Sequence, residues 1–109
     1  MSDLTQQHCV PCEGGVAPYT KAQAEERMSK IPGWQLRDDG KEISRQLKFK
    51  NFKEALAFVN RVGELAEAEG HHPDLELGWG RVGMRSSTHA IKGLSLNDFI
   101  LAAKINQLL

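Results

Sequence analysis

NFKEALAFVNRVGELAEAEGHHPD, residues 51–74, joins the clearest helical pattern in the chain to a pair of adjacent histidines. Apolar residues recur at spacings of three and four across residues 52–66, which predicts an amphipathic helix. Asn51 can cap its first turn, and Gly70 tolerates the left-handed conformation in which many helices end. Pro73 disfavours a helical conformation for the residue before it. We therefore expect the chain to leave a helix at the histidine pair and to enter a strand.

Strand patterns lie on both sides of this helix. Residues 43–49 alternate between apolar and polar side chains after a short stretch at 34–38, and Asp39-Gly40 between them is typical of a turn. After the helix, residues 75–79 and 82–89 alternate in the same way around a turn at Gly80-Arg81. The second of these strands is expected to end at His89, and Trp79 to lie within the first.

Two further helices complete the pattern. One is expected to begin at Thr20, with Gln23 forming a capping box, and the other at Ser95, with Asp98 in the equivalent position. The order helix, two strands, helix, two strands, helix predicts an α+β two-layer sandwich. Its four-stranded antiparallel sheet would carry the three helices on one face.

Composition restricts the kind of protein. The chain has 109 residues, 40% hydrophobic and 26% charged, which suits one globular domain. Lys plus Arg and Asp plus Glu are 14 each, so no net charge favours nucleic acid or an anionic membrane. No apolar run approaches the roughly 20 residues of a membrane span, and the N-terminus has no signal-peptide pattern. We expect a cytoplasmic protein.

Residues 1–18 are polar and are expected to form a flexible arm before a single domain at 19–109. The arm contains Cys9 and Cys12, a Cys-x-x-Cys spacing that allows three interpretations. It could supply half of a zinc site, although no further cysteine exists to complete one. It could be a redox motif, although Glu-Gly-Gly follows where a helix would be expected. It could also hold two reduced, solvated thiols.

The histidines allow three interpretations as well. His71, His72 and His89 with Glu67 could bind zinc or iron, although adjacent residues in an extended chain point in opposite directions. A histidine at a helix end could simply stabilise the helix dipole. The three imidazoles could instead act as general acids and bases, because the unperturbed pKa of histidine lies near neutral pH. Asp98 could serve only as a helix cap, and Trp79 only as a packed aromatic residue.

The ordered set Glu67, His71, His72, Pro73, Trp79, His89 and Asp98 resembles the signature of the pterin-4a-carbinolamine dehydratases. The surrounding chain is similar to that family from Tyr19 to the C-terminus. Cys9 and Cys12 lie outside the signature.

The resemblance implies dehydration of a 4a-hydroxytetrahydropterin to a quinonoid dihydropterin, recycling the pterin cofactor of aromatic amino acid hydroxylases. It implies catalytic positions at His71, His72, His89 and Glu67, and substrate-binding positions at Trp79, Pro73 and Asp98. It implies no metal or cofactor, a small-molecule pterin as substrate, and a homodimer or homotetramer. Some family members also act as dimerisation cofactors for a transcription factor helix. A non-catalytic binding module is therefore the alternative.

Overall fold

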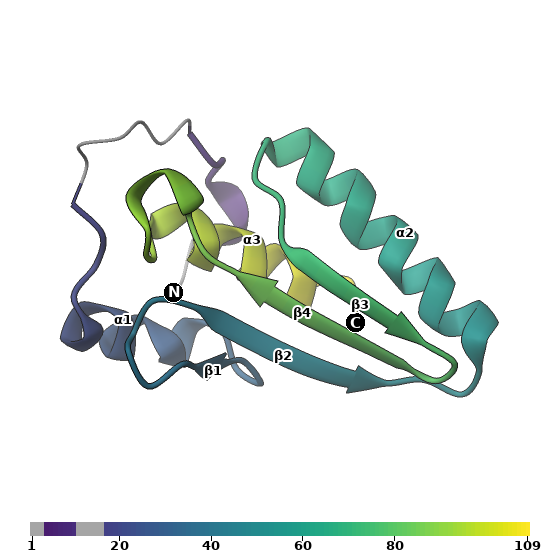
Figure 1. The fold of residues 1–109 in the computed structure, drawn as a ribbon. Helices are drawn as coiled ribbons and strands as arrows, with labels where there is room; N and C mark the ends of the chain where they lie inside the picture. Colours follow the sequence, from purple (N-terminus) through teal and green to yellow (C-terminus); the bar gives the residue numbers. More distant parts are fainter. Residues whose placement is uncertain (1–3, 11–16) are drawn as a thin grey trace.

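The computed structural model of the chain describes residues 4–10 and 17–109. Four antiparallel strands form a single sheet in the order β1-β2-β4-β3 (Figure 1). The strands are β1 (Gln35–Leu36), β2 (Ile43–Lys48), β3 (Asp74–Gly78) and β4 (Arg81–Ser86). Three α-helices lie on one side of the sheet: α1 (Lys21–Arg27), α2 (Phe52–Glu69) and α3 (Leu96–Asn106). The predicted α+β sandwich with three helices is confirmed.

The core lies between the sheet and the helices. Ile43 of β2 and Val82 and Met84 of β4 are fully buried on the helix side of the sheet. They share one apolar cluster with Phe58 of α2 and Phe99 of α3, which are also fully buried. Burying each such side chain stabilises the fold by roughly 1.5–3 kcal/mol. This packing holds α2 and α3 against the sheet.

The helix ends follow the predicted capping chemistry. Asn51 Oδ1 accepts a hydrogen bond of 2.9 Å from the N–H of Glu54, and Gly70 ends α2 with a φ of 66°. Thr20 and Ser95 each begin a helix with a capping box, as predicted. The chain therefore leaves α2 in a left-handed turn at the residue before the histidine pair.

Two details of the predicted strands are wrong. Gly78 pairs with Arg81, so the two-residue turn is Trp79-Gly80 and Trp79 lies outside the strand. Glycine is required in this turn because a Cβ on Gly80 would lie 2.9 Å from the carbonyl oxygen of Phe49. Strand β4 ends at Ser86, and His89 begins a 3₁₀ helix, η3 (His89–Ile91). The chain turns back there, because Thr88 and Gly93 form an isolated β-bridge.

Residues 4–10 lie against the folded domain. Their first turn, η1 (Leu4–Gln6), packs on α3, and Leu4 is buried. Cys9 is partly buried, so the interpretation of two solvated thiols is wrong for this cysteine. Cys12 lies outside the described residues.

Across the described part of the chain, no helix combines the length and the apolar character that crossing a membrane requires.

Candidate active site

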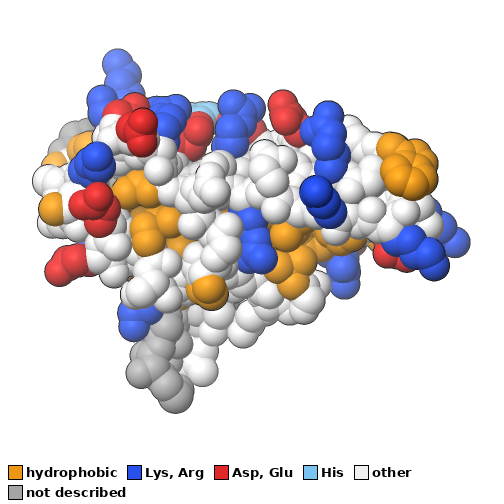
Figure 2. All heavy atoms as spheres, turned by 90° about the horizontal axis from the view of Figure 1, so that it is seen from below, with side chains coloured by type: hydrophobic (Ala, Val, Ile, Leu, Met, Phe, Trp, Pro, Cys, Tyr) orange, Lys and Arg blue, Asp and Glu red, His pale blue; other side chains and the backbone are white. Residues whose placement is uncertain are grey.

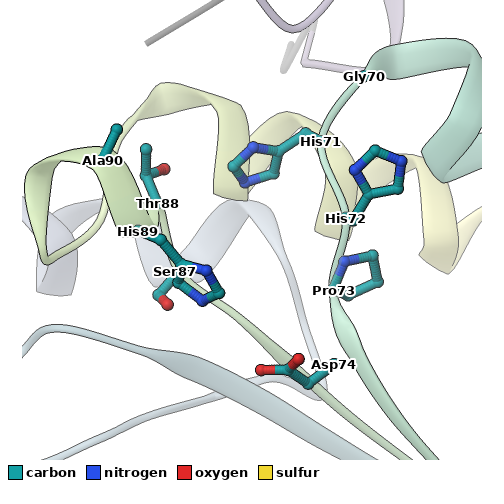
Figure 3. Close-up of a pocket in the computed structure, with 9 residues that line it drawn as sticks. All are labelled: Gly70, His71, His72, Pro73, Asp74, Ser87, Thr88, His89 and Ala90. Atoms are coloured by element: carbon teal, nitrogen blue, oxygen red, sulfur yellow. The ribbon is translucent and has the colours of Figure 1, made fainter. Parts of the chain in front are cut away.

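A pocket of about 350 Å³ lies between the exit of α2 and the turn after β4. One wall is residues 70–74, which include both adjacent histidines and Pro73, and the other wall is residues 87–90. Figure 3 shows the rings of His71 and His89 pointing into the space between these walls, from opposite sides. The sheet and helix ends thus bring together three histidines that are up to 18 residues apart in the sequence.

His71 is the most enclosed of the three. Its side chain is 12% exposed, and its Nε2 lies 2.7 Å from Oδ1 of Asp98, which is completely buried. A carboxylate can only accept hydrogen bonds, so this contact places the proton of a neutral His71 on Nε2. The other ring nitrogen, Nδ1, is then left with a lone pair that can accept a proton.

Asp98 is held by several donors besides His71. Its carboxylate accepts hydrogen bonds from the hydroxyls of Ser86 (2.6 Å) and Thr88 (2.7 Å) and from the N–H of Ser95 (3.0 Å). A buried carboxylate is costly unless such partners satisfy its oxygens. Asp98 therefore lies behind His71 and fixes it, rather than facing the pocket as a substrate-binding residue would.

His72 and Glu67 form the second imidazole–carboxylate pair. Nε2 of His72 lies 2.6 Å from Oε2 of Glu67. Both side chains are more than half exposed, at 59% and 80%. Figure 3 shows the ring of His72 on the side of the chain opposite to that of His71, as expected of neighbours in an extended segment.

His89 is exposed, like His72, and lies in the wall opposite the histidine pair. Its position at the first residue of η3, rather than at the end of a strand, turns the ring back toward the histidine pair (Figure 3). Ser87, which also lines the pocket, lies two residues before it. An open-sided pocket with one enclosed and two accessible imidazoles can exchange protons with a small polar molecule.

Trp79 is not brought to this pocket. It is 70% exposed in the turn between β3 and β4 and borders a different hollow with Lys48 and Arg81. Figure 2 shows an exposed hydrophobic group at the end of the molecule that carries this turn in Figure 1. With a rise of about 3.3 Å per residue, β3 separates Trp79 from the pocket residue Asp74 by roughly 16 Å.

A second polar cluster surrounds Glu69, the residue before Gly70 of the pocket wall. Glu69 is 5% exposed and lies 2.6 Å from the ammonium group of Lys104 on α3. The same carboxylate accepts a hydrogen bond from the N–H of Cys9 (2.8 Å) and lies 3.3 Å from Nδ1 of His8. Burial raises the pKa of Glu69, but these hydrogen bonds and the charge of Lys104 outweigh it and lower that pKa to about 2.

The N-terminal residues also bind the start of α3. The side chain of Asn97 accepts a hydrogen bond from the N–H of Val10 (3.0 Å) and donates one to its carbonyl oxygen. Burial, followed by the negative charge of Glu69, raises the pKa of Cys9 to about 12. That thiol is therefore held neutral at physiological pH, which does not suit a nucleophile or a metal ligand.

Sequence reasoning missed the residues that hold Asp98. Ser86 and Thr88 continue the alternation that begins with Val82 and Met84, so they fall on the core side of β4 and of the segment after it. Polar residues at core-facing positions need buried hydrogen-bond partners. Their place in this alternation therefore could have indicated a buried polar partner such as Asp98. Among the described residues, no three His, Cys, Asp or Glu side chains are grouped as a metal site would require.

The chain is thus a small two-layer α+β domain with histidines gathered at a helix exit and in the turn after a strand. Residues 17–108 match the family model described as "Pterin 4 alpha carbinolamine dehydratase". The chain belongs to this family. The resemblance stated from the signature residues is confirmed.

Related proteins are similar in sequence to this chain over nearly their whole length. A protein of Halorhodospira halophila is 55% identical over 105 residues, covering 96% of both chains. A protein of Rubrobacter xylanophilus is 48% identical over 108 residues, covering 99% of this chain and all of that one. Each carries the name "Putative pterin-4-alpha-carbinolamine dehydratase".

Two solved structures have a fold similar to that of this chain. A "transcriptional coactivator/pterin dehydratase" from Brucella melitensis is 31% identical, with a TM-score of 0.78 over 84% of this chain and 97% of that one. A pterin dehydratase-like protein described as a RuBisCO assembly factor has a TM-score of 0.61 over 72% of this chain. Its identity is 18%, so that likeness concerns the fold alone.

Proposed function

We propose that this protein dehydrates a 4a-hydroxytetrahydropterin to the quinonoid dihydropterin, with His71, His72 and His89 as general acids and bases. The observation that carries the proposal is the pocket in which His71, backed by buried Asp98, faces His89. Membership of the pterin carbinolamine dehydratase family supports the same reaction.

The reaction needs two proton transfers. The bond between C4a and the hydroxyl oxygen breaks, and the oxygen leaves as water after an acid protonates it. The lone pair of N5 forms the new C=N bond with C4a, and a base takes the proton from N5. Positioned acids and bases each contribute roughly 10²–10⁴-fold to such a reaction.

The contacts of the histidines suit these two roles. His71, with its Nε2 hydrogen-bonded to Asp98, has Nδ1 available as a base at the enclosed side of the pocket. His89 is exposed at the opposite wall and would protonate the leaving hydroxyl. His72 is oriented by Glu67 and would exchange protons with solvent at the pocket mouth. Pro73 would contribute a rigid edge against which the flat ring rests.

The test is the rate of water loss from freshly generated 4a-hydroxytetrahydropterin, measured with and without a chelator. The His71→Ala, His72→Ala and His89→Ala variants should fold normally and lose activity by about 10²-fold each. His8→Ala is the matched control, since His8 lies outside the pocket and 83% of its side chain is exposed. Full activity in all three pocket variants would refute the proposal.

The second candidate is a binding module for a transcription factor helix. It is favoured by the description of the Brucella melitensis neighbour as a coactivator and by the partly exposed side chains of Phe52 and Leu56 on α2. If binding were the only function, replacing His71 and His89 would leave partner capture intact, and no dehydration would be measured in the native protein.

We further propose that the protein acts as a cytoplasmic homodimer or homotetramer. The strand β3 lies at an edge of the sheet, and Leu77 on it is partly exposed. Exposed strand edges with apolar side chains are common sites of association.

A further inference from the structure

A second pocket, of about 420 Å³, lies on the other side of His89. It is bounded by residues 37–42 around the β1–β2 turn, by Ser87 and His89, and by Lys92 and Gly93. Ser87 and His89 also line the histidine pocket, so these two residues separate the two hollows. We refer to this second hollow as the side pocket. The function proposed above makes no use of it.

Charges in the side pocket leave an excess of positive charge. Arg37 pairs with both carboxylates, at 2.9 Å to Asp39 and 3.4 Å to Glu42. The two ammonium groups that line the same pocket belong to Lys41 and Lys92. The backbone N–H of Lys41 donates a hydrogen bond to Asp39 (3.0 Å), but among the described residues neither ammonium group forms an ion pair with a carboxylate. Three cations therefore face two carboxylates, and both lysines can bind an anion.

The backbone at Lys92 places this lysine beside His89. Lys92 has a φ of 55°, and it is the only non-glycine residue with a positive φ in the part of the chain that the structure describes. Lys92 is the residue that ends η3, and a left-handed conformation is common at that position. The hydrogen bond from the N–H of Lys92 to the carbonyl oxygen of His89 (3.2 Å) closes this turn and holds Lys92 next to the histidine.

Pterin chemistry connects the two pockets. The ring atom N5, which loses its proton, is bonded both to C4a, which loses the hydroxyl, and to C6, which carries the substituent of natural pterins. If His89 acts at the hydroxyl on C4a, the substituent on C6 begins two bonds from that carbon, across N5. His71 lies at the enclosed side of the histidine pocket and His89 at the exposed side, so a substituent that leaves the pocket passes beside His89, where the side pocket lies.

We infer, on the basis of the proposed function, that the side pocket binds the C6 substituent and selects substrates in which it carries a negative charge. Lys41 and Lys92 would supply that selectivity, with a carboxylate or a phosphate as the recognised group. They are specificity residues, since neither lines the histidine pocket.

The experiment compares dissociation constants of two unreactive pterins, pterin-6-carboxylate and 6-methylpterin, measured by titration of pterin fluorescence. Native protein should bind the carboxylate about tenfold more tightly, because each ion pair formed with these two exposed lysines contributes a few-fold. In the Lys41→Gln/Lys92→Gln variant, the ratio of the two constants should fall to about one. Lys30→Gln/Lys53→Gln removes the same charge from exposed positions outside the side pocket and should keep the native ratio.

Equal affinity of native protein for both pterins would overturn the inference, as would an equal loss of selectivity in the control variant. A 6-phosphate-bearing pterin as a third probe distinguishes the two anions: tighter binding than the carboxylate assigns the pocket to phosphate. The proposed function is judged separately, from dehydration of the 6-methyl carbinolamine. That reaction can succeed when the charge selectivity is absent.

Discussion

At the scale of single residues, the contact between His71 and Asp98 determines what the pocket can do. A neutral imidazole has one proton to place on two nitrogens, and the buried carboxylate fixes it on Nε2. Ser86, Thr88 and the backbone of Ser95 hold that carboxylate in turn. The base of the proposed reaction is thus oriented before substrate arrives.

Replacing Asp98 with Asn should lower kcat by about 10²-fold with little change in KM, because an amide can place its NH₂ group against His71 and favour the wrong tautomer. The pH profile of kcat/KM should shift as well, and a merely structural role for Asp98 would not produce that shift. Ser86→Ala serves as the control. It should destabilise the fold by about 1 kcal/mol and retain most of the activity. Native kinetics in the folded Asp98→Asn protein would contradict this role for Asp98.

Cys9 is expected to react slowly in the folded protein. Burial and the nearby carboxylate of Glu69 raise its pKa to about 12, and the reactive species is the thiolate. At pH 8, iodoacetamide should therefore label Cys9 much more slowly in native protein than in denaturant, as measured by peptide mass spectrometry. Equal labelling rates in the two conditions would show that the docked position of Cys9 is wrong.

At the scale of elements, the site depends on where helices end. The exit of α2 at Gly70 could be predicted from the sequence, because glycine is favoured in the left-handed conformation there, and so could the capping box that begins α3. The 3₁₀ turn at His89 could not, because alternation continues through Thr88 and only the bridge to Gly93, a tertiary contact, turns the chain back.

The contacts of the N-terminal segment could not be predicted from the sequence either. Nothing near Cys9 in the sequence indicates that its N–H binds a carboxylate 60 residues away. The three histidines and Glu67 could be proposed as one group from the sequence. Trp79 could not be placed correctly, because the turn between β3 and β4 lies one residue earlier than the sequence pattern predicted. Local chemistry was therefore predictable, and contacts between distant segments were not.

The docked N-terminal segment should depend on Glu69. The Glu69→Gln variant leaves the enclosed ammonium group of Lys104 without its carboxylate and should lower the free energy of unfolding by about 2 kcal/mol. Glu64→Gln, an exposed position on the same helix, should change it by less than about 0.5 kcal/mol. Chemical denaturation of both variants measures the difference.

The contribution of Glu69 should also depend on pH. Its pKa is about 2 in the folded protein and 4.5 ordinarily, so the unfolded chain binds the proton more readily. The stabilisation is then complete above pH 4.5 and is lost as the pH falls toward 2. Native protein should lose stability across this interval faster than Glu69→Gln. Parallel pH profiles for the two proteins would contradict the assignment.

At the scale of the whole molecule, one edge of the sheet and one helix carry partly exposed apolar side chains. Phe52 and Leu56 lie on α2, and Leu77 lies on the edge strand β3, which contacts that helix. An apolar surface next to an unpaired strand edge is typical of a protein that associates with copies of itself.

Light scattering after size-exclusion chromatography should therefore give a dimer or a tetramer. Leu77→Lys, a charge placed on the strand edge, should shift the native protein toward smaller species, because an edge lysine opposes strand pairing. Gln46→Lys, on the central strand β2, is the control and should leave the mass unchanged. A native monomer at micromolar concentration would contradict the proposed assembly.

The central claim is that a pterin binds between His71 and His89, and long-range ¹H–¹⁵N spectra of the imidazole rings test it most directly. On addition of an unreactive 7,8-dihydropterin, the ring signals of His71 and His89 should shift together in a saturable manner, while those of His8 remain in place. The native His71 spectrum should already show its proton on Nε2. Saturable binding that leaves both the His71 and His89 signals unchanged would contradict the claim.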